Sequence, residues 1–243
     1  MQSSQHIPVT VLTGFLGSGK TTLLKRILTE QHGHRIAVIE NEFGEEGVDN
    51  ELLLQDQQEQ IVEMNNGCIC CTVRGDLVRI LNDLHRRKKA GEVQFERVII
   101  ETTGLADPGP VAQTFFIDDD IADAYLLDAV ITVVDAKHAM TQLDQSKEIR
   151  EQVAFADRLL LSKVDLIDED ALQALKTRLL RINPRAPMSE VHFGQTDIKQ
   201  ILDIRGFNLN AILEIDPQFL ETDEHDHDED VSSFVFRSNK PFD

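Results

Sequence analysis

One motif near the amino terminus constrains the fold more than any other feature of the chain. Residues 14–21, GFLGSGKT, match the phosphate-loop pattern G-x-x-x-x-G-K-[ST]. The motif follows an apolar, β-branched run at residues 7–13 and precedes a stretch from Lys20 to Gln31 whose leucines and isoleucine share one helical face. A strand, a glycine-rich loop and a helix in this order begin a βαβ unit, so we expect a parallel sheet.

Apolar runs of the same kind recur along the chain and are separated by amphipathic stretches. The strands expected to be buried on both faces are RIAVIE at 35–40, ERVIIE at 96–101, DAVITVVD at 128–135 and DRLLLS at 157–162. The expected helices cover 74–90 and 168–182, and the second ends where Asn183 precedes Pro184. This alternation predicts an α/β fold with a doubly wound, mostly parallel sheet.

The phosphate loop carries the groups that nucleotide binding requires. Its glycines, beginning with Gly14, allow successive backbone N–H groups to converge on phosphate oxygens. Lys20 adds positive charge at the β- and γ-phosphates, and Thr21 supplies a hydroxyl ligand to Mg²⁺. We expect Lys20 to face solvent and to contribute little to the core. The alternative is a glycine-rich turn that matches by chance, and the flanking strand and helix disfavour it.

A second nucleotide element follows the apolar run at 98–100. That run ends in Glu101, and Gly104 follows shortly after it. An acid at this strand end can hold Mg²⁺ through water, and a glycine N–H can approach the γ-phosphate closely because no Cβ intervenes. An acid after a strand can also be a simple helix cap. Its position behind a phosphate loop favours a Walker B element followed by a switch.

A candidate for base recognition follows the last predicted strand. Ser162-Lys163-Val164-Asp165 resembles the N/T/S-K-x-D signature of GTPases. The Asp165 carboxylate can accept hydrogen bonds from guanine N1–H and the exocyclic amine, a donor pair that adenine lacks, and the Lys163 stem can lie over the purine plane. By itself this tetrapeptide can be an ordinary strand-to-helix turn. Its order behind the other two motifs favours GTP over ATP.

The cysteines of the chain form one cluster, Cys68, Cys70 and Cys71. Their odd number and close spacing disfavour disulfides and indicate reduced thiols. Thiolates in one short loop can converge on a thiophilic ion, and Zn²⁺ is favoured by its softness and tetrahedral tolerance. The alternative is buried, inert cysteine. Glu40 and Glu42, near the end of the second predicted strand, can reach Mg²⁺ or the thiolate-bound metal, or can be solvated acids.

Composition limits the partners and the compartment. The formal net charge of −19 disfavours nucleic acid and anionic membranes as partners, because both would be repelled. No apolar run is long enough to span a membrane, and the amino terminus lacks the pattern of a signal peptide. Together with the reduced cysteines, these features lead us to expect a cytoplasmic protein.

The sequence predicts a division into parts of unequal size. We expect residues 1–213 to form the nucleotide-binding domain with the cysteine site, and 214–230 to form an acidic, histidine-containing linker. Residues 231–243 alternate like one β-strand, which is not stable alone, and we expect them to begin a truncated C-terminal domain.

The motifs, in this order, resemble those of the CobW family of SIMIBI-class P-loop GTPases over residues 8 to about 205: GFLGSGKTTLL, IENEFGE, NNGCICC, ETTGLADPGP and SKVDL. The resemblance implies GTP hydrolysis coupled to delivery of zinc or cobalt, and a small α/β domain after the linker. It implies site residues by position: Gly17, Ser18, Gly19, Lys20, Thr21 and Thr22 at the phosphates, Glu101 and Gly104 in a switch, Ser162, Lys163 and Asp165 at the base, and Cys68, Cys70 and Cys71 at the metal. A histidine that relatives carry after a TFF segment is absent after Phe116, which leaves ligands beyond the cysteines unassigned.

These observations predict a GTP-hydrolysing metallochaperone that binds Zn²⁺ or Co²⁺ and passes it to a client metalloprotein. GTP and Mg²⁺ would order the loops that carry Glu40, Glu42 and the cysteines, and hydrolysis would release them. Lys20 and Mg²⁺ would neutralise charge while Glu42 or Glu101 orients water. A dimer that depends on nucleotide or metal is a further expectation. Two alternatives stay open: a P-loop kinase of a small metabolite, and a non-catalytic zinc or redox sensor locked by GTP.

Overall fold

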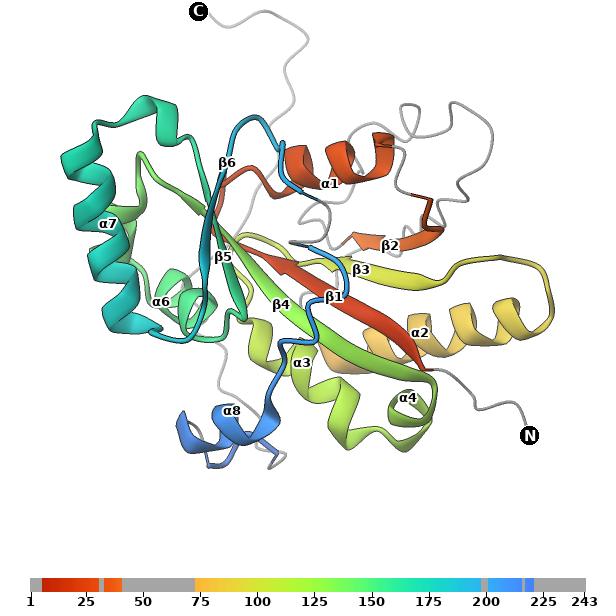
Figure 1. The fold of residues 1–243 in the computed structure, drawn as a ribbon. Helices are drawn as coiled ribbons and strands as arrows, with labels where there is room; N and C mark the ends of the chain where they lie inside the picture. The colour runs from red at the N-terminus through yellow and green to blue at the C-terminus, as the bar shows by residue number, and fades with distance from the viewer. Residues whose placement is uncertain (1–5, 31–32, 41–72, 198–200, 216, 221–243) are drawn as a thin grey trace, which may run out of the picture.

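The computed structural model describes residues 6–30, 33–40, 73–197, 201–215 and 217–220. These residues form a six-stranded sheet with helices on both faces (Figure 1). The strand order is β2-β3-β1-β4-β5-β6, and the pairing is parallel throughout the described sheet. The predicted doubly wound α/β fold is confirmed.

The strands follow the apolar runs of the sequence closely. Their bounds are β1 (Ile7–Thr13), β2 (Ile36–Glu40), β3 (Arg97–Glu101), β4 (Tyr125–Asp135), β5 (Arg158–Ser162) and β6 (Met188–Val191). All but β6 coincide with a predicted strand to within a few residues at each end. The sequence predicted no strand at β6, which is short and only partly buried.

The helices include the three predicted ones and several that the sequence did not indicate. Their bounds are α1 (Lys20–Thr29), α2 (Val73–Lys89), α3 (Pro108–Ile117), α4 (Asp119–Ala124), α5 (Ala139–Gln145), α6 (Lys147–Ala154), the 3-10 helix η1 (Val164–Leu166), α7 (Glu169–Ile182) and α8 (Leu209–Ile215). At the start of α7, the Asp168 carboxylate accepts from the backbone N–H of Ala171 at 2.8 Å and caps the helix.

The central strands are buried on both faces, as their continuous apolar runs predict. In β5, Leu159 and Leu161 pack with α5, α6 and α7, whereas Leu160 points to the opposite face and packs with α1. The helices α2, α3 and α4 pack against β1, β3 and β4 through a further cluster (Figure 1). The sheet is therefore held between two helical layers.

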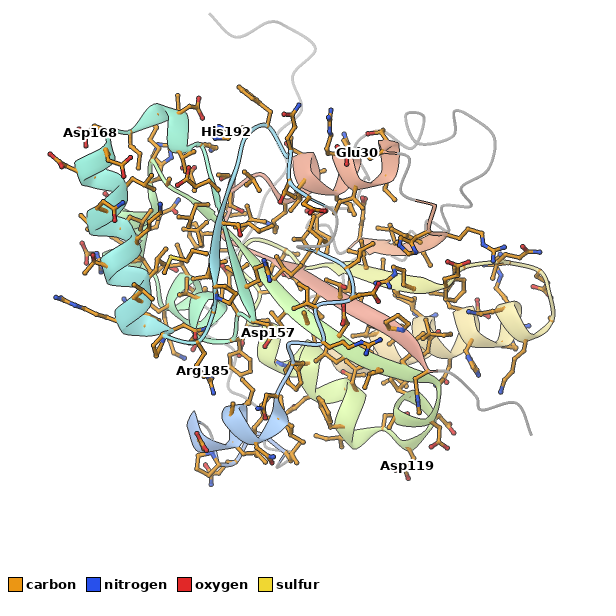
Figure 2. All side chains as sticks on the ribbon, in the orientation of Figure 1. Glu30, Asp119, Asp157, Asp168, Arg185 and His192 are labelled. Carbon is orange, nitrogen blue, oxygen red and sulfur yellow. The ribbon has the colours of Figure 1, made fainter. Side chains whose placement is uncertain are left out.

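The parallel arrangement gives the sheet two chemically different edges. Asp168 and His192 follow β5 and β6 at the carboxyl edge, whereas Asp157 and Arg185 precede these strands at the amino edge (Figure 2). The strand order reverses around β1, because β2 and β4 lie on opposite sides of it. Sheets of this kind bind ligands at the carboxyl edge beside such a reversal.

Two further expectations concern membranes and domain boundaries. Among the residues that the structure describes, no helix combines the length and the apolar character needed to cross a membrane. The helix α8 spans the boundary expected at residue 213. Most of the predicted linker at 214–230, and the strand predicted at 231–243, lie outside the described residues, so the division of the chain stays a prediction.

Candidate functional site

The nucleotide motifs meet at the carboxyl edge of the sheet. The phosphate loop follows β1, Glu101 ends β3 and Ser162 ends β5. Leu12 of β1 is paired in register with Glu101, and Asp135 at the end of β4 is paired with Ser162. Segments that are far apart in the sequence therefore end side by side.

The phosphate loop packs tightly against two neighbouring segments, and glycines permit both contacts. A Cβ at Gly14 would lie 2.3 Å from the carbonyl oxygen of Val133, and the Gly14 φ of +143° is rare for other residues. A Cβ at Gly104 would lie 2.6 Å from the backbone nitrogen of Leu16. Both obstacles are backbone atoms, so a side chain at either position would displace the loop. Gly104, the predicted switch glycine, thus lies directly against the phosphate loop.

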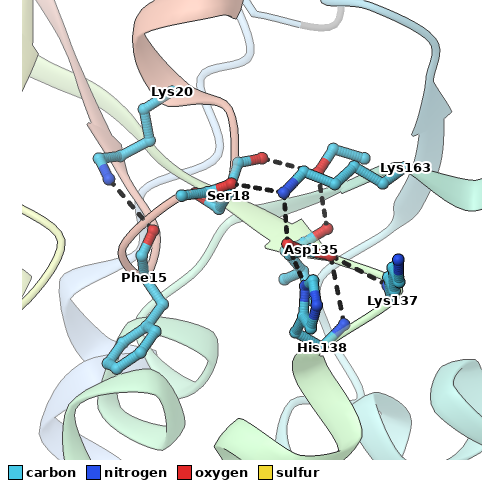
Figure 3. Close-up of polar contacts among 10 residues, drawn as sticks. Phe15, Ser18, Lys20, Asp135, Lys137, His138 and Lys163 are labelled. Atoms are coloured by element: carbon cyan, nitrogen blue, oxygen red, sulfur yellow. Dashed lines mark hydrogen bonds and ion pairs between the residues drawn. The ribbon is translucent and has the colours of Figure 1, made fainter. Parts of the chain in front are cut away.

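Lys20 lies inside the loop. It is 8% exposed, and its Nζ donates to the carbonyl oxygens of Gly14 at 2.7 Å and Phe15 at 3.3 Å (Figure 3). Burial lowers the pKa of Lys20, and the nearby Glu101 carboxylate partly offsets that effect. The expectation that Lys20 faces solvent is wrong, because the ammonium turns back onto the carbonyl groups of its own loop. A phosphate anion would be a stronger partner than these neutral acceptors.

Thr21 and Glu101 form a pair that suits Mg²⁺. The Thr21 hydroxyl donates to Oε1 of Glu101 at 2.8 Å, and Glu101 is buried. Beside them, Thr102 Oγ1 donates to Thr13 Oγ1 at 2.8 Å and ties the end of β3 to the end of β1. A hydroxyl and a carboxylate at one point are oxygen ligands of the kind that Mg²⁺ takes in nucleotide sites. This donor set fits the ion that the motif implies.

The base-recognition candidate is hydrogen bonded to the phosphate loop. Ser162 Oγ donates to the carbonyl oxygen of Ser18 at 2.6 Å, and Lys163 Nζ donates to that of Gly17 at 2.8 Å (Figure 3). Lys163 has a left-handed backbone with φ of 57°, which turns the chain from β5 into η1. Asp165 lies in η1 and is exposed. Its side chain is therefore accessible to a ligand.

Asp135 belongs to the same network, although the motifs did not indicate it. It ends β4 and is 3% exposed, and its Oδ2 lies 2.6 Å from Lys163 Nζ and 2.9 Å from His138 Nδ1. Burial opposes ionisation of Asp135, but the hydrogen bonds of Lys163 and His138 prevail and hold its pKa below the ordinary value. The sequence could have indicated Asp135, because it ends an apolar run in the same way as Glu101 does.

Gln152 is a second residue that the sequence did not mark. It lies in α6 and is fully buried, and its Nε2 donates to the carbonyl oxygens of Gly104 at 3.1 Å and Ala106 at 3.0 Å. These bonds connect α6 to the predicted switch. A glutamine in an amphipathic helix carries no sequence signal of its own, because most such residues face solvent.

Comparison with known proteins decides the family. The model of the CobW/HypB/UreG nucleotide-binding domain matches residues 8–190. The chain belongs to this family. The zinc chaperone YjiA of Escherichia coli K12 is 47% identical over 241 residues, which cover 98% of this chain and 73% of YjiA. The zinc-regulated GTPase metalloprotein activator 1 of Schizosaccharomyces pombe is 36% identical over 258 residues, which cover 95% of this chain and 62% of that protein.

A solved structure of this CobW/HypB/UreG family supports the same assignment. The crystal structure of the Zn(II)-bound YjiA GTPase from E. coli matches with a TM-score of 0.67 at 43% identity. The match covers 84% of this chain and 63% of that one. The chain thus spans only part of the length of the relatives that it matches. The resemblance to the CobW family is confirmed.

The metal residues predicted for this CobW/HypB/UreG domain lie mostly outside the described residues. These are Glu42, Cys68, Cys70 and Cys71. Glu40 is described: it ends β2, is exposed and is paired in register with Glu101. Within the described ranges, no group of three or more His, Cys, Asp or Glu side chains could hold a metal ion. The register places Glu40 beside the Thr21–Glu101 pair, and the cysteine site stays a prediction.

Proposed function

We propose that this chain is the GTPase domain of a metallochaperone that binds Zn²⁺ or Co²⁺ and couples GTP hydrolysis to metal transfer. The observation that carries the proposal is the register of β2 on β3. Glu40, which precedes the cysteine-bearing segment, is level with Glu101 of the magnesium pair. Loss of the γ-phosphate on hydrolysis would therefore change the surroundings of Glu40, the point at which the cysteine-bearing segment leaves the sheet. The relatives named zinc chaperone and zinc-regulated GTPase support GTP hydrolysis and zinc as the cargo.

The phosphates are bound at the start of α1. Backbone N–H groups of residues 14–22 bind their oxygens, except that of Ser18, which donates to the carbonyl oxygen of Phe15 at 3.1 Å; Ser18 and Thr22 add hydroxyls. Lys20 exchanges its two carbonyl acceptors for the β- and γ-phosphates. Thr21 and Glu101 would hold Mg²⁺, and the ion would neutralise charge on the transferred phosphoryl group. This part of the site needs no change in the fold, because the groups already converge.

Hydrolysis depends mainly on positioning. The oxygen of a water molecule attacks the γ-phosphorus, the bond to the β–γ bridging oxygen breaks, and GDP and phosphate leave. Glu101 or Glu42 orients that water, and the Gly104 N–H approaches the γ-phosphate. Lys20 stabilises the charge that develops on the leaving oxygens.

Guanine is recognised by the segment after β5. The Asp165 carboxylate accepts from the two guanine donors, and the stem of Lys163 covers one face of the purine. Ser162 and Lys163 support this contact through their hydrogen bonds to the phosphate loop. GTP is favoured over ATP because adenine leaves the Asp165 carboxylate without these donors.

The metal is cargo held by the thiolates of Cys68, Cys70 and Cys71, with Glu40 and Glu42 as neighbouring oxygen donors. Thiolates favour soft, tetrahedral ions such as Zn²⁺ and also bind Co²⁺. GTP closes this site through its greater affinity for the ordered loops, and hydrolysis releases the metal to a client metalloprotein. Reduced thiols suit a cytoplasmic setting. A nucleotide- or metal-dependent dimer is part of the proposal.

Metal titration in three nucleotide states tests this function. Bound GTP with Mg²⁺ should tighten Co²⁺ or Zn²⁺ by roughly 5- to 150-fold, about 1 to 3 kcal/mol, and the metal should tighten GTP equally. GDP should not have this effect. Cobalt gives the readout, because thiolate ligands produce an intense near-ultraviolet band. The matched control is the triple variant Cys68→Ser, Cys70→Ser and Cys71→Ser, which should lose the band and still bind GTP.

Other results would point to a different function. Equal metal affinity in the nucleotide-free, GDP and GTP forms would make the cysteine cluster a static site and remove the chaperone role. ATP bound as tightly as GTP would favour a kinase of a small metabolite. Binding of GTP without multiple turnover would favour a sensor.

A further inference from the structure

The ammonium of Lys163 has two partners of different character. Its Nζ donates to the neutral carbonyl of Gly17 at 2.8 Å, and the carboxylate oxygen Oδ2 of Asp135 lies 2.6 Å away. The Lys163 side chain is about one-third exposed, whereas Asp135 is almost fully buried. The Asp135 carboxylate therefore supplies a negative charge to Lys163 from the buried side of the pair. Water is largely excluded there, so a charged hydrogen bond is strong.

The two oxygens of Asp135 make different contacts (Figure 3). Oδ1 accepts from the backbone N–H groups of Lys137 at 3.0 Å and His138 at 3.2 Å and so caps the turn after β4. Oδ2 faces Lys163 Nζ and also lies 2.9 Å from His138 Nδ1. The contact with Lys163 is thus separable, atom by atom, from the local turn.

Asp135 is also the more rigidly held member of the pair. It lies in β4, which is paired with strands on both sides. Lys163 follows the end of β5 and has a φ of 57°, a conformation that is unfavourable for residues with a Cβ. A residue in such a conformation needs support from its surroundings. The fixed carboxylate provides that support at the side-chain end.

We propose that Asp135 is a positioning residue for guanine recognition. Its Oδ2 holds Lys163 across the phosphate loop, so that the surface on which the purine stacks is in place before the nucleotide binds. This inference rests on the proposed function, because it takes residues 162–165 as the base site. Asp135 itself contacts no nucleotide and acts through Lys163.

A double-mutant cycle tests the proposal in the full chain. Asp135→Asn keeps the Oδ1 acceptor for the turn, and its new NH₂ group can donate to His138 but cannot accept from Lys163. Lys163→Met keeps the aliphatic stem and removes the ammonium. Calorimetry would give the dissociation constants of GTP and ATP for the wild type, both single variants and the double variant. The kcat at saturating GTP would be measured in parallel.

We expect non-additive losses. Each single variant should weaken GTP binding by about 10-fold and the double variant by about the same factor, a coupling of about 1.4 kcal/mol. ATP affinity should fall by less than GTP affinity, because adenine loses only the stacking on the Lys163 stem, whereas guanine also loses support for its contact with Asp165. The selectivity for GTP should therefore fall. The kcat of Asp135→Asn at saturating GTP should stay within about threefold, because Asp135 contacts no nucleotide and the lost contact affects binding and not the chemical step.

His138→Ala is the matched control. The substitution removes the other side chain that contacts Oδ2 of Asp135 and leaves Lys163 intact. The His138 side chain is 54% exposed, so the fold should tolerate its loss and the GTP affinity should not change. Should Asp135→Asn unfold cooperatively at a much lower temperature than the wild type, the cycle is repeated with Asp135→Ser, whose hydroxyl still accepts from the turn.

The outcomes distinguish a failure of the positioning role of Asp135 from a failure of the proposed guanine recognition. A 100-fold loss in the double variant, unchanged GTP affinity in Asp135→Asn, or an equal loss in His138→Ala would each overturn the positioning role alone. A wild-type chain without preference for GTP would overturn the guanine assignment and this proposal together.

Discussion

Asp135 and Asp157 lie at opposite edges of the same sheet and meet opposite electrostatic surroundings. At the carboxyl edge, the hydrogen bonds of Lys163 and His138 outweigh burial and keep the pKa of Asp135 low. At the amino edge, burial raises the pKa of Asp157 to about 6. A backbone hydrogen bond from Val130 at 2.7 Å and the charge of Arg185 offset only part of that rise.

The difference shows that burial disfavours the ionised form of a carboxylate. Its hydrogen-bond and charged partners decide whether that form is stabilised enough to keep the pKa low. Among the described residues, Asp157 accepts a hydrogen bond from Val130, whereas Asp135 has Lys163, His138 and two backbone N–H groups as partners. A cavity of about 220 Å³ is lined by Asp157 together with Arg185 and Asn208. We therefore expect changes at the carboxyl edge to alter nucleotide chemistry with little effect on stability. Changes at the amino edge should alter stability and its pH dependence.

The largest expected effect is on Lys20. Lys20→Ala should reduce GTP hydrolysis by about 1,000-fold, about 4 kcal/mol in activation free energy, because the phosphates lose their buried countercharge. Circular dichroism and the thermal midpoint should change little, since the hydrogen bonds of the ammonium go to carbonyl groups of its own loop. Lys25→Ala, on an exposed position of the same helix, is the control and should hydrolyse GTP normally. Full activity in Lys20→Ala would place the phosphates elsewhere.

At the amino edge, Asp157→Asn should change how stability depends on pH. The folded pKa of Asp157 is about 6, above the ordinary value of 3.8, so the folded state binds this proton more tightly than the unfolded state. The resulting stability is fully present below about pH 4 and is lost as the pH rises through 6. The loss should reach about 2 to 3 kcal/mol by pH 7. The asparagine variant should lack it, while its amide oxygen still accepts from Val130.

Urea unfolding of both proteins at pH 4.5 and pH 7 measures this effect. The difference between wild type and variant removes the contribution of the other titrating groups. GTP hydrolysis at pH 7 should be the same in both proteins, because Asp157 lies at the far edge of the sheet. Parallel pH profiles of stability would show that Asp157 is ionised like an exposed carboxylate, and the contrast between the edges would fail.

A smaller effect is expected at Asp165, which sharpens the functional side of the comparison. Asp165→Asn should weaken GTP binding by about 10- to 100-fold, roughly 1.4 to 2.7 kcal/mol, because the guanine donors lose a charged acceptor. Stability should not change, since the side chain is exposed. Asp170→Asn on the exposed first turn of α7 is the matched control. Calorimetry with GTP and ATP checks both, and equal affinities of Asp165→Asn and wild type for GTP would contradict the base assignment.

The sequence predicted the strands that are buried and the helices that have one apolar face. It did not predict β6, where only Val191 is buried, because a half-exposed edge strand has no clear period. It also did not predict α3, which begins Pro108-Gly109-Pro110. That tripeptide has the composition of a turn, yet a proline in the first helical turn is favourable when Asp107 caps the helix.

For the site, the sequence indicated which segments carry chemistry but not how their side chains pair. The motifs that contain Lys20, Thr21, Glu101 and Ser162 each lie at or after the carboxyl end of a predicted strand. In a parallel sheet these ends share one edge, so the sequence predicted that the motifs lie together. The contact of Asp135 with Lys163 depends on the register between β4 and β5, which no single segment encodes. The inward turn of Lys20 is made within its own loop and depends on the loop conformation, which the motif alone does not specify. The roles of these residues stay predictions, and so does the whole cysteine site.

Gln152 offers a practical route to observing the switch. Its side-chain amide donates to the carbonyl oxygens of Gly104 and Ala106, so the segment that contains them cannot rearrange without breaking these bonds or carrying α6 with it. Lys147, at the start of α6, has a side chain that is 73% exposed. An environment-sensitive dye attached at position 147 would therefore convert the nucleotide state into an optical signal while the GTP and the metal remain unlabelled.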